Sequence, residues 1–241
     1  MSRGGVYAVT GGSRGIGREL VKKLCERGER VLAVGRDLET LRALHDATGA
    51  DVLSADLATA AGSNAIVDRV RAYDEPLMGL IHNAGMVRTG RLAETGLEDI
   101  EAQLALNLRA PLELTRALVP HLSNGSTVIA VSSTLASRPA EGRAVYAATK
   151  SGLEAFARCM ALELGPLGVR VNALAPGVVD TDMIRDSLSG DSTEGLEMLR
   201  GLHPLGRLGR TDDIWLGVEY LLDAGFVTGT VLTIDGGLTL G

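Results

Sequence analysis

The chain has 241 residues, of which 45% are hydrophobic and 3% are aromatic, and it carries a formal net charge of −6 with a pI near 5.3. This acidic balance, without any run of basic residues, argues against nucleic-acid binding, and no apolar run approaches the ~18 residues of a membrane span or forms the core of a signal peptide. Cys25 and Cys159 favour neither a disulfide nor a metal site, and both are expected to be buried. From length and composition together, we expect one cytoplasmic α/β domain.

Apolar runs rich in β-branched residues alternate along the chain with helix-length amphipathic segments. This alternation is typical of βαβ units and a parallel sheet. We therefore expect residues 1–241 to form a single-domain Rossmann fold, in which helices flank a doubly wound parallel sheet of about seven strands. The predicted strands cover residues 6–10, 30–35, 51–54, 77–81, 127–131, 169–174 and 230–234.

A glycine-rich turn joins the first predicted strand to the first predicted helix, at 18–27. Its residues are Gly11, Gly12, Ser13, Arg14, Gly15, Ile16 and Gly17. Glycines let the backbone adopt positive φ angles and let a pyrophosphate approach the N–H groups at the helix start. A glycine-rich loop can be a purely structural turn, but its position between a strand and a helix favours a dinucleotide-binding site.

The second strand ends before Arg36 and Asp37, which bear on the choice of cofactor. Folds that bind NAD usually have an acidic residue here for the ribose 2′-hydroxyl, whereas an arginine suits the 2′-phosphate of NADP. Arg36, with Arg14 as a second guanidinium, therefore favours NADP(H), and the neighbouring Asp37 weakens that preference. A surface charge beside the helix at 38–48 is the alternative role for Arg36.

Two later strand ends add candidate contacts for the same cofactor. Asp56 and Leu57 follow the third strand and could meet the adenine ring, although Asp56 could equally cap the helix that begins near Thr59. The fourth strand leads into His82, Asn83, Ala84 and Gly85. Small residues there would let the backbone pass beneath a cofactor, and His82 is expected to be a packed or hydrogen-bonded structural residue.

The helix predicted at 97–121 contains a polar residue, Asn107, in an otherwise apolar-periodic stretch. Pro111 lacks a backbone N–H and would clash with the carbonyl of residue 107. The helix is therefore expected to kink, and the freed carbonyl could hold a water molecule.

The most informative stretch runs from the fifth strand into a helix at 144–165. The strand leads into Ser132 and Ser133, at the edge where open α/β sheets keep their ligands, and the helix carries Tyr146 and Lys150 on one face. An unperturbed tyrosine has a pKa near ~10, and a fixed cation beside it lowers that pKa toward the working range of an acid–base catalyst. A tyrosine and a lysine four residues apart also occur often by chance, so Tyr146 and Lys150 alone would fit an ordinary helix surface.

Four residues follow the sixth strand, namely Pro176, Gly177, Val179 and Thr181. The next segment, at about 182–209, breaks the regular alternation at the edge of the sheet where a substrate lid would be built. Its aliphatic residues are Met183, Ile184, Leu188, Leu196, Met198, Leu199 and Leu202, and core packing explains them as well as substrate contact does. A helix at 211–222, with Thr211 as its N-cap, precedes the last strand.

Together these motifs resemble those of the short-chain dehydrogenase/reductase family, over essentially the whole chain. The resemblance rests on residues 10–17, Asp56, residues 83–85, Asn107, Ser133, residues 146–150, Pro176, Gly177, Thr181, residues 228–230 and residues 235–237. Each motif is common alone, whereas the full set in this order is highly specific. The departures are small, since His82 stands where the family more often has asparagine and the segment at 222–226 is slightly shorter than usual.

The resemblance implies a catalytic set and a reaction. The set is Asn107, Ser133, Tyr146 and Lys150, and the family spacing to the tyrosine favours Ser133 over Ser132. A nicotinamide hydride would attack a ketone carbon while Tyr146 protonates the carbonyl oxygen and Ser133 donates a hydrogen bond to it. Lys150 would lower the pKa of Tyr146 and hold the nicotinamide ribose, and Asn107 would position a water that links Lys150 to solvent.

The resemblance also implies a binding site for NADP(H) and no metal. The implied cofactor-binding residues are Gly11, Ser13, Arg14, Gly15, Ile16, Gly17, Arg36, Asp56, Leu57, Asn83, Ala84, Gly85, Tyr146, Lys150, Pro176, Gly177, Val179 and Thr181. Thr181 and the backbone near Val179 would anchor the carboxamide end of the cofactor.

The chain looks most like the 3-oxoacyl-[acyl-carrier-protein] reductases, which implies a carrier-bound acyl thioester or another small aliphatic carbonyl as substrate. Arg138 and Arg143 could meet an anionic carrier, although solvated surface positions are the simpler explanation. The alternatives are an NAD(P)-dependent alcohol or polyol dehydrogenase that works in the oxidative direction, and a non-catalytic dinucleotide-sensing protein. The family usually forms homotetramers, and we carry that over as an expectation, with neither nucleic acid nor membrane as a partner.

Overall fold

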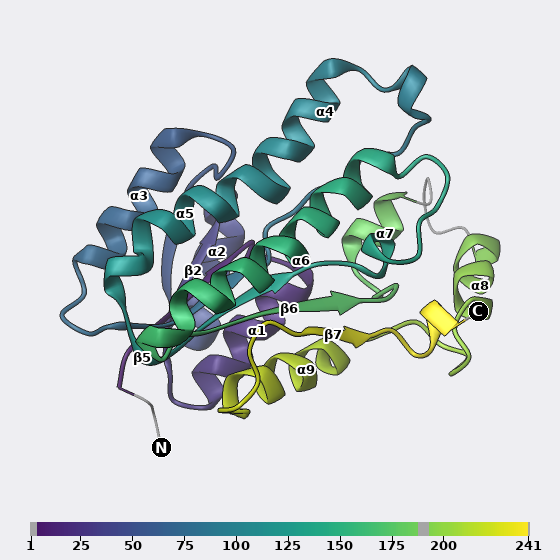
Figure 1. Cartoon of the computed structure of the whole chain (residues 1–241). Coiled ribbons are helices and arrows are strands. Elements are labelled where there is room, and N and C mark those ends of the chain that lie inside the picture. Colours follow the sequence, from purple (N-terminus) through teal and green to yellow (C-terminus); the bar gives the residue numbers. More distant parts are fainter. Residues whose placement is uncertain (1–3, 188–192, 241) are drawn as a thin grey trace.

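The computed structural model describes residues 4–187 and 193–240, within which seven strands form one parallel sheet (Figure 1). The strands are β1 Val6–Thr10, β2 Arg30–Gly35, β3 Asp51–Ser54, β4 Leu77–His82, β5 Leu122–Val131, β6 Arg170–Pro176 and β7 Val231–Ile234. Their order across the sheet is β3-β2-β1-β4-β5-β6-β7, and every neighbouring pair is parallel. The chain winds outward from β1 in one direction and from β4 in the other, which confirms the predicted doubly wound Rossmann fold.

Helices cover both faces of the sheet (Figure 1). They are α1 Gly15–Glu26, α2 Leu38–Thr48, α3 Ala60–Arg71, α4 Leu97–Leu104, α5 Ala110–Leu118, α6 Ala144–Leu164, α7 Asp182–Ser187, α8 Thr193–Gly201 and α9 Thr211–Asp223. Alternate strand residues face opposite sides, so two cores form. Val6 and Ala8 of β1 pack with α3, α5 and α6, whereas Tyr7 and Val9 pack with α1, α2 and α9. Across the described ranges, no helix combines the length and apolar character that a membrane crossing needs.

Several predicted strands and helices have the observed bounds, and others begin or end at different residues. The strands at 6–10, 30–35 and 51–54 and the helix at 38–48 have the predicted bounds. α1 begins at Gly15, inside the glycine-rich turn, rather than at residue 18. The N-cap position of α9 belongs to Arg210, whose N–H donates to the Asp213 carboxylate at 2.7 Å, so the prediction of Thr211 as N-cap is wrong.

The long helix predicted at 97–121 is interrupted near the predicted position. α4 gives way to a π-helical segment, Ala105–Arg109, which contains Asn107. Pro111 then lies in the first turn of α5, where its missing N–H is not needed by the helix. The irregularity expected from the proline is therefore a wider π turn just ahead of it.

The two cysteines differ in exposure. Cys25 is partly buried on α1, whereas Cys159 is exposed, so the expectation that both are buried is wrong for Cys159. The buried stripe of α6 runs through Leu153, Ala157 and Ala161, and helical periodicity places Cys159 off that stripe.

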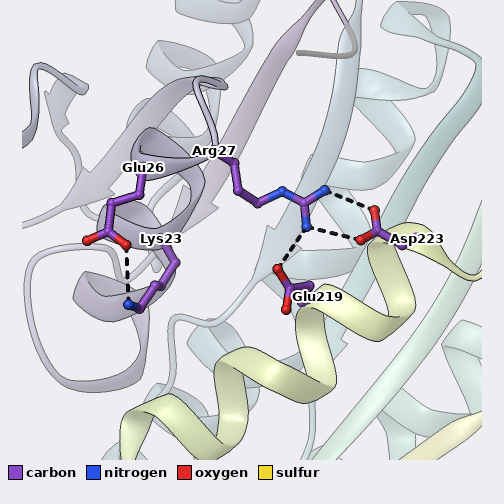
Figure 2. Close-up of polar contacts among 5 residues, drawn as sticks. All are labelled: Lys23, Glu26, Arg27, Glu219 and Asp223. Carbon is purple, nitrogen blue, oxygen red and sulfur yellow. Dashed lines mark hydrogen bonds and ion pairs between the residues drawn. The ribbon is translucent and has the colours of Figure 1, made fainter. Parts of the chain in front are cut away.

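Arg27 ties the end of α1 to α9 (Figure 2). Its guanidinium lies 3.3 Å from Glu219 Oε1 and 2.9 Å from Asp223 Oδ1, and its central carbon stands 5.9 Å from the centroid of the Trp215 ring. Lys23, by contrast, pairs with a residue of its own helix. The Arg27 contacts connect segments from the two ends of the chain on one face of the sheet, although exposed ion pairs each contribute little to stability.

His82 is buried at the end of β4, with 2% of its surface exposed. Its Nε2 lies 2.7 Å from Thr115 Oγ1 on α5. Burial lowers the pKa of His82 to about 3, so the folded protein keeps this imidazole neutral at physiological pH. The predicted structural role of His82 is confirmed.

The pH dependence of folding tests this burial. Because the unfolded imidazole has a pKa near ~6.5 and the folded one about 3, the contribution of His82 is complete above about pH 6.5 and is lost as the pH falls toward 3. Wild-type protein should therefore lose about 2 kcal/mol of unfolding free energy from this group between about pH 7.5 and about pH 5. His82→Asn has no titrating group at this position, so its unfolding free energy, measured by urea unfolding, should not show this loss. An equal pH dependence in the two proteins would contradict the neutral, buried imidazole.

Candidate active site

Apart from Asn107, Tyr146 and Lys150, the predicted site residues lie at or just beyond the carboxyl ends of six parallel strands. Residues 11–17 follow β1, Arg36 follows β2, Asp56 and Leu57 follow β3, Asn83, Ala84 and Gly85 follow β4, Ser133 follows β5, and Pro176 ends β6 ahead of Gly177, Val179 and Thr181. Because the strands are parallel, these residues lie along one edge of the sheet, on both sides of the switch point between β1 and β4. Open α/β sheets bind their ligands at this edge.

The turn between β1 and α1 forms a cradle that side chains would fill. Gly11 has a φ of 66°, and a Cβ on Gly17 would collide with the Gly11 oxygen. Asn83 Nδ2 donates to the Thr10 and Gly11 oxygens at 3.0 and 3.1 Å, so Asn83 braces the turn from the end of β4. Arg14 holds the N-cap position of α1 without a side-chain cap, and no acidic residue lies in the first turn. The N–H groups at this helix start therefore suit an anion such as a pyrophosphate.

The end of β2 lies against this cradle. A Cβ on Gly35 would lie 2.9 Å from Ser13 Oγ, so Arg14 and Arg36 leave adjoining segments, and both are exposed. Asp37 caps α2 through two backbone N–H groups, at 2.9 and 3.2 Å. One oxygen of its carboxylate, Oδ1, is thus engaged within its own helix, and Arg36 and Asp37 are both exposed at this strand end.

Asp56 and Leu57 lie next to the cradle after β3. The Asp56 carboxylate is exposed and accepts from Ala58 N at 3.0 Å, whereas α3 is capped by Thr59, whose hydroxyl accepts from a first-turn N–H at 3.1 Å. The alternative role of Asp56 as the cap of α3 is therefore wrong. The Leu57 side chain is buried in the core, so only its backbone could contact a ligand, and that contact stays a prediction.

β5 and α6 bring Ser133, Tyr146 and Lys150 together. Tyr146 lies in the first turn of α6, and Lys150 follows one turn later on the same face. The Lys150 ammonium donates to the Val131 carbonyl at 2.7 Å and lies 5.6 Å from the centroid of the Tyr146 ring. Ser133 lies close enough to Tyr146 for its hydroxyl to lower the Tyr146 pKa. A hydroxyl, a phenol and an ammonium thus meet at the carboxyl end of β5.

The neighbouring serine faces another partner, which the sequence analysis did not identify. Ser132 Oγ donates to Glu154 Oε1 at 2.9 Å, and both residues are buried. Glu154 lies one turn beyond Lys150 on α6. The four-residue spacing of Tyr146, Lys150 and Glu154 is the signal that could have indicated it.

The environment of Tyr146 raises its pKa, because the residue is half-buried and burial disfavours the phenolate. The Ser133 hydroxyl and the charge of Arg143 act in the opposite direction. This net rise corrects the expectation that Lys150 lowers the Tyr146 pKa. The Lys150 ammonium turns toward the Val131 carbonyl, and its own burial lowers the pKa of Lys150 to about 8.

Asn107 is fully buried beside Lys150 and holds backbone atoms of Met86. Its Nδ2 donates to Met86 O and its Oδ1 accepts from Met86 N, both at 2.8 Å, and Nδ2 also lies 3.3 Å from Thr149 Oγ1. A Cβ on Gly85 would lie 3.5 Å from both Asn107 Oδ1 and Lys150 Nζ, so the chain passes close to both. The role of Asn107 in positioning a water stays a prediction.

The segment after β6 closes the other side of the cradle. Thr181 Oγ1 donates to Val179 O at 3.3 Å, and its methyl carbon would lie 3.4 Å from a Cβ on Gly15. Pro176 ends β6, and Gly177 lies so close to Asp235 that a Cβ there would meet its Cα at 2.8 Å. The end of β6 therefore borders the glycine-rich turn, where both could contact one extended ligand.

The proposed lid at 182–209 contains α7 and α8, and its aliphatic side chains lie outside the core. Met183, Met198 and Leu202 are exposed, and Ile184, Leu196 and Leu199 are half-buried. Leu188 lies outside the described residues. Core packing is therefore the weaker explanation for the aliphatic residues, and their role in covering a substrate stays a prediction.

Comparisons with known proteins agree with this geometry. A family model described as Enoyl-(Acyl carrier protein) reductase matches residues 11–239. The human protein named 3-oxoacyl-[acyl-carrier-protein] reductase is 34% identical over 239 residues, which covers 98% of each chain. A solved short-chain dehydrogenase/reductase mutant from Serratia marcescens has a TM-score of 0.90 and 35% identity, over 98% of each chain. A short chain dehydrogenase from Burkholderia cenocepacia J2315, solved in complex with NADP, has a TM-score of 0.88 and 34% identity, over 96% of each chain.

These similarities extend from the glycine-rich turn to the end of the last strand. The sheet order and the clustering of polar residues at its carboxyl edge are the features that such a fold uses to bind a dinucleotide. The chain therefore belongs to the short-chain dehydrogenase/reductase family, whose members are oxidoreductases that use nicotinamide dinucleotide cofactors.

Proposed function

We propose that the protein is an NADPH-dependent ketoreductase, which reduces a 3-oxoacyl thioester or a similar small aliphatic ketone to a secondary alcohol. The observation that carries this proposal is the meeting of Ser133, Tyr146 and Lys150 at the carboxyl end of β5, on the sheet edge that also holds the glycine cradle. When bound, the nicotinamide group supplies the hydride. The chain supplies the proton, the orientation of the ketone and the stabilising charge.

Tyr146 is the proposed proton donor. Its raised pKa keeps the phenol protonated at neutral pH, so the hydroxyl can give its proton to the carbonyl oxygen as negative charge develops there. Ser133 would donate a hydrogen bond to the same oxygen. Lys150, with a pKa of about 8, carries a positive charge 5.6 Å from the centre of the Tyr146 ring. Asn107 would position the water through which Tyr146 regains a proton.

The proposed cofactor is NADP(H). The glycine cradle and the uncapped start of α1 suit its pyrophosphate, and Lys150 would hold the nicotinamide ribose, with Thr181 and the backbone of Val179 at the carboxamide. The exposed Arg36 and Arg14 suit the 2′-phosphate, since Asp37 is occupied as the cap of α2. The NADP complex of the Burkholderia protein supports the same choice.

The proposed substrate class follows from the relatives and from the lid. The human relative and the E. coli relative, the latter 31% identical, are both named 3-oxoacyl-[acyl-carrier-protein] reductase. The aliphatic, half-buried or exposed side chains of α7 and α8 would suit an acyl chain better than an aromatic ring. A homotetramer, carried over from the family, is the proposed assembly.

Replacing Tyr146 with phenylalanine should remove the proton donor and leave the fold intact. With 3-oxoacyl thioesters and small ketones, we expect kcat for NADPH oxidation to fall by about 10²- to 10⁴-fold, while NADPH still binds. Tyr220→Phe is the matched control, because Tyr220 is exposed on α9, which packs on the sheet face opposite α6. If Tyr146→Phe keeps most of the activity, another group donates the proton.

Replacing Arg36 with aspartate should reverse the cofactor preference. Hydrogen bonds to a charged group contribute about 1.5–3 kcal/mol, so we expect kcat/KM with NADPH to fall about 10- to 150-fold and kcat/KM with NADH to rise. Arg42→Asp provides the control for the change in charge, because Arg42 is exposed on α2. An unchanged ratio of the two kcat/KM values in Arg36→Asp would exclude Arg36 as the phosphate contact.

A further inference from the structure

The end of β5 and one face of α6 meet through three successive pairs of residues. The pairs are Val131 with Lys150, Ser132 with Glu154 and Ser133 with Tyr146. The partners on α6 are four residues apart, so they follow one another along one face of the helix. The first and third pairs belong to the proposed site, whereas the second lies next to it and has no part in the mechanism above.

The Ser132–Glu154 pair is a buried, charge-assisted hydrogen bond. Ser132 Oγ donates its single proton toward Glu154 Oε1 at 2.9 Å, with the Lys150 carbonyl oxygen at 3.2 Å as a second acceptor. Ser132 is 3% exposed and Glu154 is 9% exposed. Such a bond is stronger in a buried setting than in water. The other carboxylate oxygen lies 3.6 Å from the guanidinium of the exposed Arg158.

Both partners are anchored in separate elements. The Ser132 N–H donates to the Leu174 oxygen of β6 at 2.7 Å, which fixes Ser132 in the sheet, and Glu154 belongs to the middle of α6. The bond between them therefore sets the position of α6 along the end of β5. A slip of the helix would alter the contacts of Lys150 and Tyr146 together.

We propose that Ser132 and Glu154 are positioning residues, whose hydrogen bond keeps the Lys150 ammonium on the Val131 carbonyl and Tyr146 beside Ser133. This inference rests on the proposed reductase function for its effect on turnover. A pair that merely stabilises the fold would lower the melting temperature without changing the ionisation of Lys150, so the two explanations predict different results.

Ser132→Ala is the decisive variant, because it removes the hydrogen-bond donor and leaves every charge in place. The chain has three lysines, Lys22, Lys23 and Lys150, so NMR of lysine-labelled protein can follow Lys150 alone, near its titration midpoint of about 8. Tyr146 and Glu154, each one helical turn from Lys150 on α6, both remain in this variant. We expect the Lys150 midpoint to fall by about half a pH unit, because the ammonium loses its firm acceptor. We also expect kcat to fall about tenfold with little change in the KM for NADPH.

Three further variants separate position from charge. Glu154→Leu removes the acceptor and should lower kcat about as much as Ser132→Ala, and the double variant should be no worse than either, since one bond is lost in each case. Glu154→Gln keeps an acceptor oxygen without the charge and should restore most of kcat. Glu163→Leu is the matched control, because Glu163 is exposed on the same helix. If Glu154→Leu does not fold, Ser132→Ala and Glu154→Gln decide the question.

A folded Ser132→Ala protein with an unchanged or raised Lys150 midpoint and wild-type kcat would overturn the inference, even if its melting temperature were lower. Failure of the proposed function would look different. In that case the wild-type protein would reduce none of the ketones, while the Lys150 titration, which needs neither cofactor nor substrate, would still decide whether Ser132 and Glu154 position the lysine.

Discussion

A charged lysine held inside the protein is the constraint on which the rest of the site depends. Moving an ammonium out of water is costly, and the cost appears in Lys150 as a pKa lowered to about 8. The Val131 carbonyl, at 2.7 Å, offsets part of that cost. This carbonyl is the last of β5, so α6 can occupy only a narrow range of positions along the strand end. Tyr146, one turn earlier on the same helix, is brought beside Ser133 as a consequence.

The cofactor side of the site depends on how each helix begins. Asp37 and Thr59 cap α2 and α3 with their side chains, whereas α1 begins in the glycine-rich turn with Arg14 at its N-cap and no side-chain cap. An uncapped start leaves backbone N–H groups without partners in the chain, which is unfavourable for a purely structural helix. At the carboxyl edge of a parallel sheet it provides the donors that a pyrophosphate needs. α4 and α6 also begin without a side-chain cap, so it is the glycine-rich turn at the carboxyl edge of the sheet that distinguishes α1 as a helix suited to a ligand.

Much of the sheet could be predicted from the sequence, because short apolar runs bounded by glycine or polar residues have few alternatives to buried parallel strands. The start of α1 could not be predicted, because Gly15 and Gly17 disfavour a helix in isolation. At Gly17 the close packing admits no side chain, so the helix needs a glycine there. The meeting of Ser133, Tyr146 and Lys150 at the end of β5 could also be predicted. The direction of the Tyr146 pKa could not, because it depends on burial and on where the Lys150 side chain turns. Glu154 resembles any charged helix residue until its burial is known.

A crystal structure of the protein with NADPH and an unreactive ketone would test most directly the claim that Tyr146 is the proton donor. We expect the ketone oxygen to lie within about 3.2 Å of both Tyr146 Oη and Ser133 Oγ, with the Lys150 ammonium on the same side of the ring. A ketone oxygen bound by other groups, with the Tyr146 hydroxyl directed away from it, would contradict that claim.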